Sequence, residues 1–175
     1  MKILARDAET GRIGTYQAAF TIPNLNREVE RLPISSVVLG SQHVPLGDAL
    51  YTVEKNAALG VNPLVYDGQK LIPSVTRVFS KSRELYVYLQ AYQRDATATQ
   101  PMVAFVSFYR GGVKVLEATP VAVTDGLDPR SKAVPLRMSV PLTDLAPGRY
   151  DCQVTVVSPA GQKVAFWRAP VAVVP

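Results

Sequence analysis

The feature that most constrains this fold is a strict alternation of apolar and polar residues. The stretch ELYVYLQAYQ at 84–93 has an aliphatic face and a tyrosine-rich face, made respectively by Leu85, Val87, Leu89 and Ala91 and by Tyr86, Tyr88, Gln90 and Tyr92. A period of two is typical of a β-strand whose two faces meet different surroundings. Further β-rich runs lie at 102–109, 112–118, 133–140, 149–157 and 163–174. No segment has a convincing helical period, so we predict an all-β, immunoglobulin-like or fibronectin-III-like β-sandwich over residues 75–175.

Two tight hairpins fit this prediction. In the first, two β-rich runs meet at Gly111 and Gly112, and glycine supplies the positive φ that such turns need. In the second, the last two runs meet across the turn SPAG at 158–161. Pro170 interrupts the final run and indicates a bulge or an exposed sheet edge, because proline cannot donate to a strand ladder.

The first 32 residues are predicted to form an extra N-terminal β-hairpin. They resemble the end of the chain, because a shift of 151 positions places Ile3 on Val154 and Tyr16 on Trp167. A hairpin alone is only marginally stable. We therefore expect residues 1–32 to be the end of an upstream β-sandwich domain; the alternative is that this hairpin packs onto the main sandwich. Residues 33–74 are expected to be a linker with one short strand, Ile34–Leu39, that joins the sandwich.

Composition narrows the classes of partner and cofactor. The chain has 175 residues, of which 47% are hydrophobic, yet no apolar run reaches the roughly 20 residues of a membrane-spanning helix. We expect that its N-terminus is no signal peptide, because charges interrupt it. The net charge of +5 comes from scattered residues, so we expect no nucleic-acid partner. Asp125 and Asp128 are too few for calcium and fit a turn. We expect no metal, cofactor or catalytic residue, and therefore no enzyme.

Cys152 is the single cysteine and could be a working thiol, half of a disulfide or a core residue. It cannot form an internal disulfide, and the single histidine, His43, lies far away in the 33–74 segment. In strand register Cys152 shares the apolar face of Val154 and Val156, so we predict a buried, unreactive side chain. Tyr150, two residues earlier, fits a tyrosine corner whose hydroxyl bonds an upstream backbone group.

Several strings resemble a known family. RDAETGRIGTYQAAFTIPNL, LPISSVVLGSQ and LIPSVTRVFSKSRELYVYLQAYQ are similar to the region downstream of the von Willebrand factor A domain in large secreted proteins of acidobacteria. In that family a hairpin closing one sandwich leads into a second sandwich, which ends in an L-x-P-G-x-Y corner, matched here by Leu145, Pro147, Gly148 and Tyr150. The A domain itself is absent, because its Asp-x-Ser-x-Ser motif is missing and the nearest string, DATAT at 95–99, lacks the serines. The resemblance implies an accessory module that is secreted or periplasmic as part of a longer protein.

The tyrosine stripe is the best candidate for an interaction surface. Exposed aromatic side chains can anchor a protein partner or stack on sugar rings. The candidate residues are Tyr86, Tyr88 and Tyr92, with Tyr109 and Trp167 nearby. The alternative is that residues 24–65 or a neighbouring domain cover this face. We predict a non-catalytic structural or protein-interaction module, with upstream domains of the same polypeptide as partners, and as the alternative a carbohydrate-binding accessory module.

Overall fold

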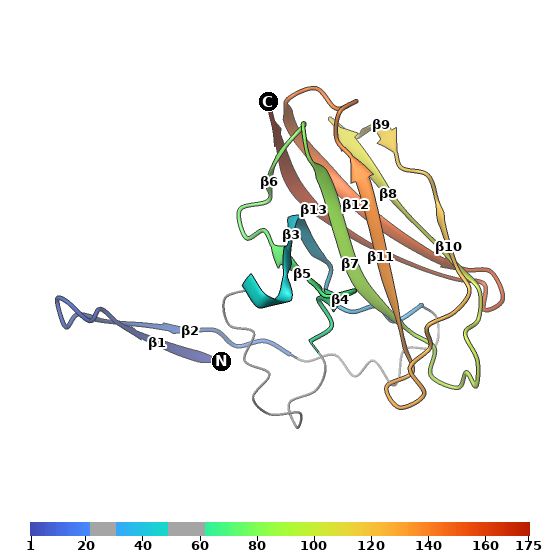
Figure 1. The fold of residues 1–175 in the computed structure, drawn as a ribbon, viewed down its shortest axis with the longest axis horizontal. Coiled ribbons are helices and arrows are strands. Elements are labelled where there is room, and N and C mark those ends of the chain that lie inside the picture. Colours follow the sequence, from blue (N-terminus) through green and yellow to red (C-terminus); the bar gives the residue numbers. More distant parts are fainter. Residues whose placement is uncertain (22–30, 49–61) are drawn as a thin grey trace.

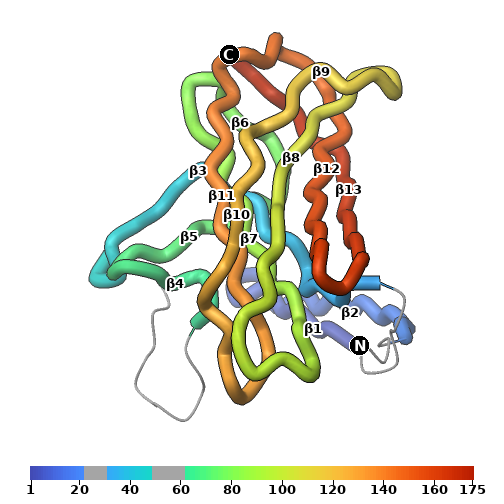
Figure 2. Tube along the Cα trace, turned by 90° about the vertical axis from the view of Figure 1, so that its right-hand side faces the viewer, coloured from blue at the N-terminus to red at the C-terminus, as the bar shows by residue number. Residues whose placement is uncertain are grey.

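The computed structural model describes residues 1–21, 31–48 and 62–175 and is an all-β, immunoglobulin-like sandwich with an extra N-terminal hairpin, as predicted (Figure 1). One sheet runs in the order β10 (Val121–Val123), β8 (Met102–Arg110), β12 (Gly148–Ser158), β13 (Lys163–Val174) and β6 (Val78–Ser80), and β9 (Val113–Glu117) also pairs with β8. The facing sheet runs in the order β11 (Ala133–Pro141), β7 (Glu84–Tyr92), β3 (Val38–Pro45), β5 (Gln69–Pro73) and β4 (Val65–Tyr66). After a quarter turn, Figure 2 shows β12 and β13 on one side of the sandwich and β3, β4 and β5 on the other.

The core lies between these two sheets and follows the alternation of the strands. On β7 the aliphatic face is buried, and Leu85 and Leu89 have no exposed surface. The same alternation buries one face of β8, β11 and β12, and Phe108 of β8 is also fully buried. The apolar side chains on the inner faces of the two sheets pack together in one continuous cluster. The predicted period of two is therefore the pattern that forms the core.

Both predicted hairpins are present. β8 and β9 are joined at Gly111 and Gly112, whose φ angles are 58° and 83°. β12 and β13 are antiparallel from Gly148 to Ser158 without a register shift, so Pro170 causes no bulge. Beyond β13, β6 pairs only with its last residues, 172–174, and Pro170 lies on the open part of this edge. Proline is tolerated there because its missing N–H belongs to no ladder.

Residues 33–74 contribute three strands, β3, β5 and β4, where the sequence suggested one short strand at Ile34–Leu39. The regular strand starts later, at Val38, because the side chain of Ser35 takes the place of a backbone acceptor in the pairing with β7. The Ser35 hydroxyl accepts a hydrogen bond from Gln90 N at 2.9 Å, where a ladder would use a backbone carbonyl. The rest of this predicted segment, at 49–61, and residues 22–30 before it lie outside the described residues.

The N-terminal hairpin is a sheet of its own, made of β1 (Lys2–Arg6) and β2 (Ile13–Gln17). Every residue of its two strands is exposed, although Ile3, Leu4 and Tyr16 are large and apolar. In Figure 1 the blue hairpin extends to one side of the two facing sheets. Within the described residues, no second sheet therefore packs on either face of this hairpin, whereas the other two sheets cover each other.

Candidate functional site

A groove forms where the five-stranded sheet divides. β3 pairs with β7 only through Val38, Leu39 and Gly40, and then continues to Pro45 paired with β5 alone. The register shifts between Gly40 and Gln42, which is how a bulge bends a strand away from its neighbour. A Cβ on Gly40 would collide with the carbonyl oxygen of Ile72, so only glycine allows β5 to approach β3 this closely.

The groove has a volume of about 390 Å³ and separates β4 and β5 from β7 and β11. Its wall is mostly apolar and aromatic, with a few polar groups. It is lined by His43, Pro63, Leu64, Tyr66, Asp67, Gln69, Leu71, Tyr86, Val87, Tyr88, Arg137, Met138 and Ser139. A concave, largely apolar surface with a small number of placed polar groups is the usual form of a binding site.

Arg137 supplies the positive charge of the groove. It points outward from β11 while its neighbours Leu136 and Met138 are buried. Its guanidinium carbon lies 4.3 Å from the ring centre of Tyr66 and 5.4 Å from that of Tyr88. These are cation–π distances, and two rings restrict a side chain that is otherwise free to rotate. Within the part of the chain that is described, no carboxylate forms an ion pair with Arg137.

Tyr88 forms the floor beneath Arg137. Its side chain is almost completely buried, and this burial raises the pKa of its hydroxyl, an effect that the positive charge of Arg137 partly opposes. Tyr88 therefore stays neutral at physiological pH. The groove is therefore lined by one basic residue, Arg137, and one acidic residue, Asp67, and its floor is a neutral aromatic ring.

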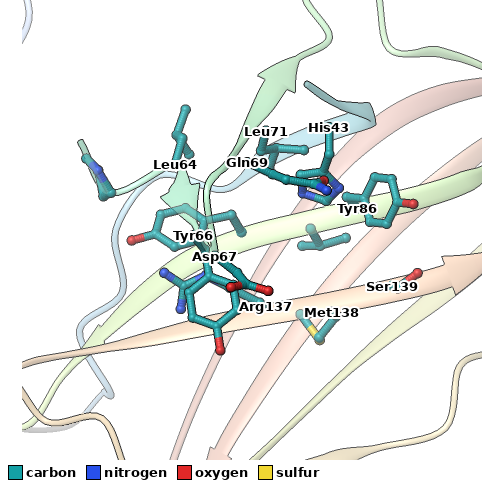
Figure 3. A pocket seen from close by; sticks show the side chains of 13 residues that line it. His43, Leu64, Tyr66, Asp67, Gln69, Leu71, Tyr86, Arg137, Met138 and Ser139 are labelled. Atoms are coloured by element: carbon teal, nitrogen blue, oxygen red, sulfur yellow. The ribbon is translucent and has the colours of Figure 1, made fainter. Parts of the chain in front are cut away.

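The walls of the groove are completed by the turn between β4 and β5 and by a pair of aromatic rings from β3 and β7. Asp67 and Gly68 have φ angles of 49° and 70°, the left-handed values of a two-residue hairpin turn, and they place Tyr66 at the mouth of the groove. At the other end, the rings of His43 and Tyr86 have centres 4.2 Å apart and are tilted by 55°. Figure 3 shows Arg137 beside Tyr66 at one end and His43 beside Tyr86 at the other.

The structure does not bring the five predicted surface residues together. Tyr86 and Tyr88 line the groove, whereas Tyr92 lines a second cavity of about 340 Å³ at the end of β7. Tyr109 lies on the outer face of the other sheet, where Arg168 is 4.6 Å from its ring centre. Trp167 packs partly buried against the core.

The separation follows from the topology, because β8 and β13 belong to the six-stranded sheet and β7 to the facing one. Sequence reasoning did not single out Tyr66, Asp67 or Arg137, and it set His43 aside as a residue of the linker. The Asp-Gly pair at 67–68, a strong hairpin signal, would have located Tyr66.

The four predicted corner residues lie together at the start of β12. The Tyr150 hydroxyl donates a hydrogen bond to the carbonyl oxygen of Ala146, next to Leu145. Its ring meets that of Phe108 edge-on at 6.3 Å. Gly148 has a φ of 153° and leaves room for the guanidinium of Arg110, which lies 5.6 Å from the centre of the Tyr150 ring.

Cys152 is buried with no exposed surface, as predicted. Burial raises the pKa of its thiol to about 12, so it carries no thiolate at neutral pH. Asp128, in the predicted acidic turn, accepts hydrogen bonds from the backbone N–H and the hydroxyl of Ser131 and from the backbone N–H of Arg130, which lower the pKa of its carboxyl group. No group of three or more His, Cys, Asp or Glu side chains in residues 1–21, 31–48 and 62–175 is placed to hold a metal ion.

Comparisons with known proteins add little to this geometry. No family model matches the chain, and no curated protein matches it. Among solved structures, the chain is similar to the CARDB domain of a Pyrococcus furiosus protein, determined in complex with di-metal ions. That likeness has a TM-score of 0.32 at 15% sequence identity and covers 55% of this chain and 84% of the other. At this level it carries no argument, and the assignment of the fold rests on the strand pairing.

Within the described residues, no helix has both the length and the apolar character needed to cross a membrane.

Proposed function

We propose that this chain is a non-catalytic structural and protein-interaction module of a larger, extracytoplasmic protein related to those that contain a von Willebrand factor A domain. The support for this context is the resemblance of three strings, at 6–25, 32–42 and 71–93, to the region that follows the A domain in that family. The state of the one thiol supports a non-catalytic role, because Cys152 is buried and this burial raises its pKa to about 12.

The groove on the five-stranded sheet is the interaction surface in this proposal, and Arg137 is the observation that carries it. A guanidinium held by two rings has its donors oriented in advance, so little rotamer freedom is lost when it binds a carboxylate. The surrounding wall is mostly apolar, with Leu64 and Leu71 beside the aromatic rings. We infer that the groove binds a peptide segment in which an apolar side chain stands next to an aspartate or glutamate.

A carbohydrate ligand is the second candidate. The observation that favours it is the open ring of Tyr66, which is 65% exposed at the mouth of the groove and could stack on a sugar. Two facts weigh against it. Tyr88 is only 6% exposed, and the ring of Tyr86 is already in tilted contact with the ring of His43.

The experiment is a parallel screen of the whole chain against a phage-displayed library of short linear peptides and against a glycan array. We expect enrichment of peptides that combine an acidic and an apolar residue, and a loss of affinity of about tenfold or more in Arg137→Gln, as for a lost charge-assisted hydrogen bond. Arg149→Gln is the matched control, since Arg149 is exposed on β12 of the opposite sheet.

Three results would contradict the peptide proposal. Binding that survives Arg137→Gln would place the ligand elsewhere. Selective glycan binding lost in Tyr66→Ala, or in the combined Tyr86, Tyr88 and Tyr92 to Ala variant, would favour the second candidate. The absence of any ligand in both screens would leave a purely structural role. The proposed context has its own test, which is to find an Asp-x-Ser-x-Ser domain in the complete gene.

A further inference from the structure

The N-terminal hairpin repeats the C-terminal hairpin pair by pair. β1 and β2 have five cross-strand pairs, and adding 151 to both members of each pair gives a pair of β12 and β13. Ile3↔Tyr16, for example, becomes Val154↔Trp167. The shift of 151 that relates the two sequences therefore also relates the cross-strand pairs of the two hairpins. Because a slip of one residue would exchange the two faces of a strand, a shared register means that equivalent residues face the same way.

The turns share one feature. The loop residue Gly11 has a φ of 70°, and its equivalent Gln162 has a φ of 48°. A non-glycine residue in this left-handed region is uncommon, so both turns place a left-handed residue at the same position. Their hydrogen bonds differ, because Gly11 N donates to Asp7 O and Gln162 N donates to Pro159 O. Next to the pair Lys2↔Gln17, Met1 and Ala18 form two backbone hydrogen bonds with each other, at the positions equivalent to Cys152 and Ala169.

This register defines a core-facing side of the N-terminal hairpin. Its residues are Met1, Ile3, Ala5, Tyr16, Ala18 and Phe20, and their equivalents are Cys152, Val154, Val156, Trp167, Ala169 and Val171, all of which pack into the core. In the N-terminal hairpin the large side chains of this set are open, with Ile3 47%, Tyr16 62% and Phe20 63% exposed. An apolar face of this kind, without a covering layer, marks an interaction surface.

We propose that this hairpin provides the last two strands of a second β-sandwich with the same strand order as residues 75–175. The strands that cover it are then the equivalents of β6 to β11. In the order of the chain all of these come before the last hairpin, so the equivalent strands come from polypeptide that precedes the hairpin in the gene product. The backbone edge of β1 that faces away from β2 is equivalent to the edge of β12 that pairs with β8. It therefore pairs with a strand that corresponds to β8.

A second copy of this chain does not provide the same cover. In residues 75–175 the position of the closing hairpin is already filled by β12 and β13, which pair with each other and with β8. The hairpin of another copy could therefore not enter that core without displacing them. The hairpin face and the groove share no residue, so either proposal can fail without the other.

The test uses the complete gene product and one matched pair of substitutions, Ile3→Asp and Leu4→Asp. Both side chains are exposed in residues 1–175 and lie next to each other on opposite faces of β1. In the complete product we expect Ile3→Asp to lower the melting temperature of a second transition by more than about 10 °C, because it buries a charge in a core. Leu4→Asp should leave that transition nearly unchanged. Neither substitution should affect the transition of residues 75–175.

Hydrogen exchange gives a second readout. The amides of β1 should exchange quickly in residues 1–175 alone and be protected in the complete product. The proposal would be overturned by a gene that encodes no strands before this hairpin, or by equal effects of Ile3→Asp and Leu4→Asp. It would also be overturned if residues 1–175 sedimented as a dimer that Ile3→Asp dissociates, because a second copy would then cover the face.

Discussion

The guanidinium of Arg137 lies over the ring of Tyr66 at 4.3 Å and so joins the first strand of the five-stranded sheet to its last. β11 and β4 share no ladder, because β7, β3 and β5 stand between them in the strand order. The contact crosses the groove at its mouth. It links the β4 end of the sheet to β11 across the groove.

This relationship predicts a measurable coupling between Arg137 and Tyr66. In a double-mutant cycle with Arg137→Gln and Tyr66→Leu, we expect a coupling free energy of about 0.5–1 kcal/mol, as for an exposed cation–π pair. Unfolding in urea measures it. The control cycle pairs Tyr66→Leu with Arg149→Gln, which lies on the other sheet and should show no coupling. Equal values in the two cycles would mean that Arg137 and Tyr66 do not interact in solution.

Gly40 should be intolerant of any side chain. Gly40→Ala adds a Cβ that would meet Ile72 O and lie 2.8 Å from Leu71 Cδ1. We expect a loss of about 1–3 kcal/mol in the free energy of unfolding, as for an overpacked site, and a groove with altered ligand affinity. Gly47→Ala is the control, because nothing lies within 4 Å of its Cβ. Similar losses in the two variants would show that β3 and β5 are farther apart than described.

The corner at Tyr150 should contribute to stability through one hydroxyl. Tyr150→Phe removes the hydrogen bond to Ala146 O while keeping the ring in the core. The expected cost is about 1 kcal/mol, because the carbonyl loses its partner in a partly buried place. Tyr16→Phe, on the exposed N-terminal hairpin, should change nothing. A melting temperature unchanged in Tyr150→Phe would argue against the corner.

Cys152 predicts a specific dependence of stability on pH. The folded state holds the thiol pKa at about 12, above the ordinary value of 9.0, so the folded chain keeps a proton that the unfolded chain loses. This stabilising effect is complete below about pH 9 and declines as pH rises toward about 12, by at most about 1.4 kcal/mol per pH unit. Other groups titrate in this window as well, so the measured quantity is the difference between the wild-type chain and Cys152→Ala.

We expect that difference to become smaller as pH rises from about 8 to about 11, when unfolding free energies of both chains are measured in urea. A thiol reagent should leave the native protein unmodified at neutral pH and modify it after denaturation. Rapid labelling of the native chain, or a difference that stays constant across this pH range, would contradict the burial of Cys152.

The layers of the sandwich were predictable from the sequence because they depend on local patterns. A period of two, glycine pairs and Pro-Gly turns act over a few residues, and they located β7, the β8–β9 hairpin and the β12–β13 hairpin. The shift that relates Ile3 to Val154 was visible for the same reason. Its agreement with the register of the ladders needed the structure.

The groove was not predictable in this way. Tyr66 and Arg137 are far apart in the sequence, and their contact depends on β3 bending away from β7 at Gly40. That bend coincides with the register shift between Gly40 and Gln42 in the pairing of β3 with β5, and no local pattern encodes this pairing. Trp167 was expected near the tyrosine stripe, whereas its position on β13 turns it toward the core.

The open edge of β13 has a consequence for how such sandwiches behave side by side. Within the described residues, 163–171 of β13 pair with β12 alone. The row of backbone N–H and C=O groups along the other edge of β13 can therefore form hydrogen bonds with a strand of another molecule. Pro170 takes a donor out of that row, and the exposed Arg168 adds a charge to it. Both features discourage strand addition between molecules. The edge of β13 therefore has a low tendency to pair with a strand of a neighbouring molecule, even at high local concentration.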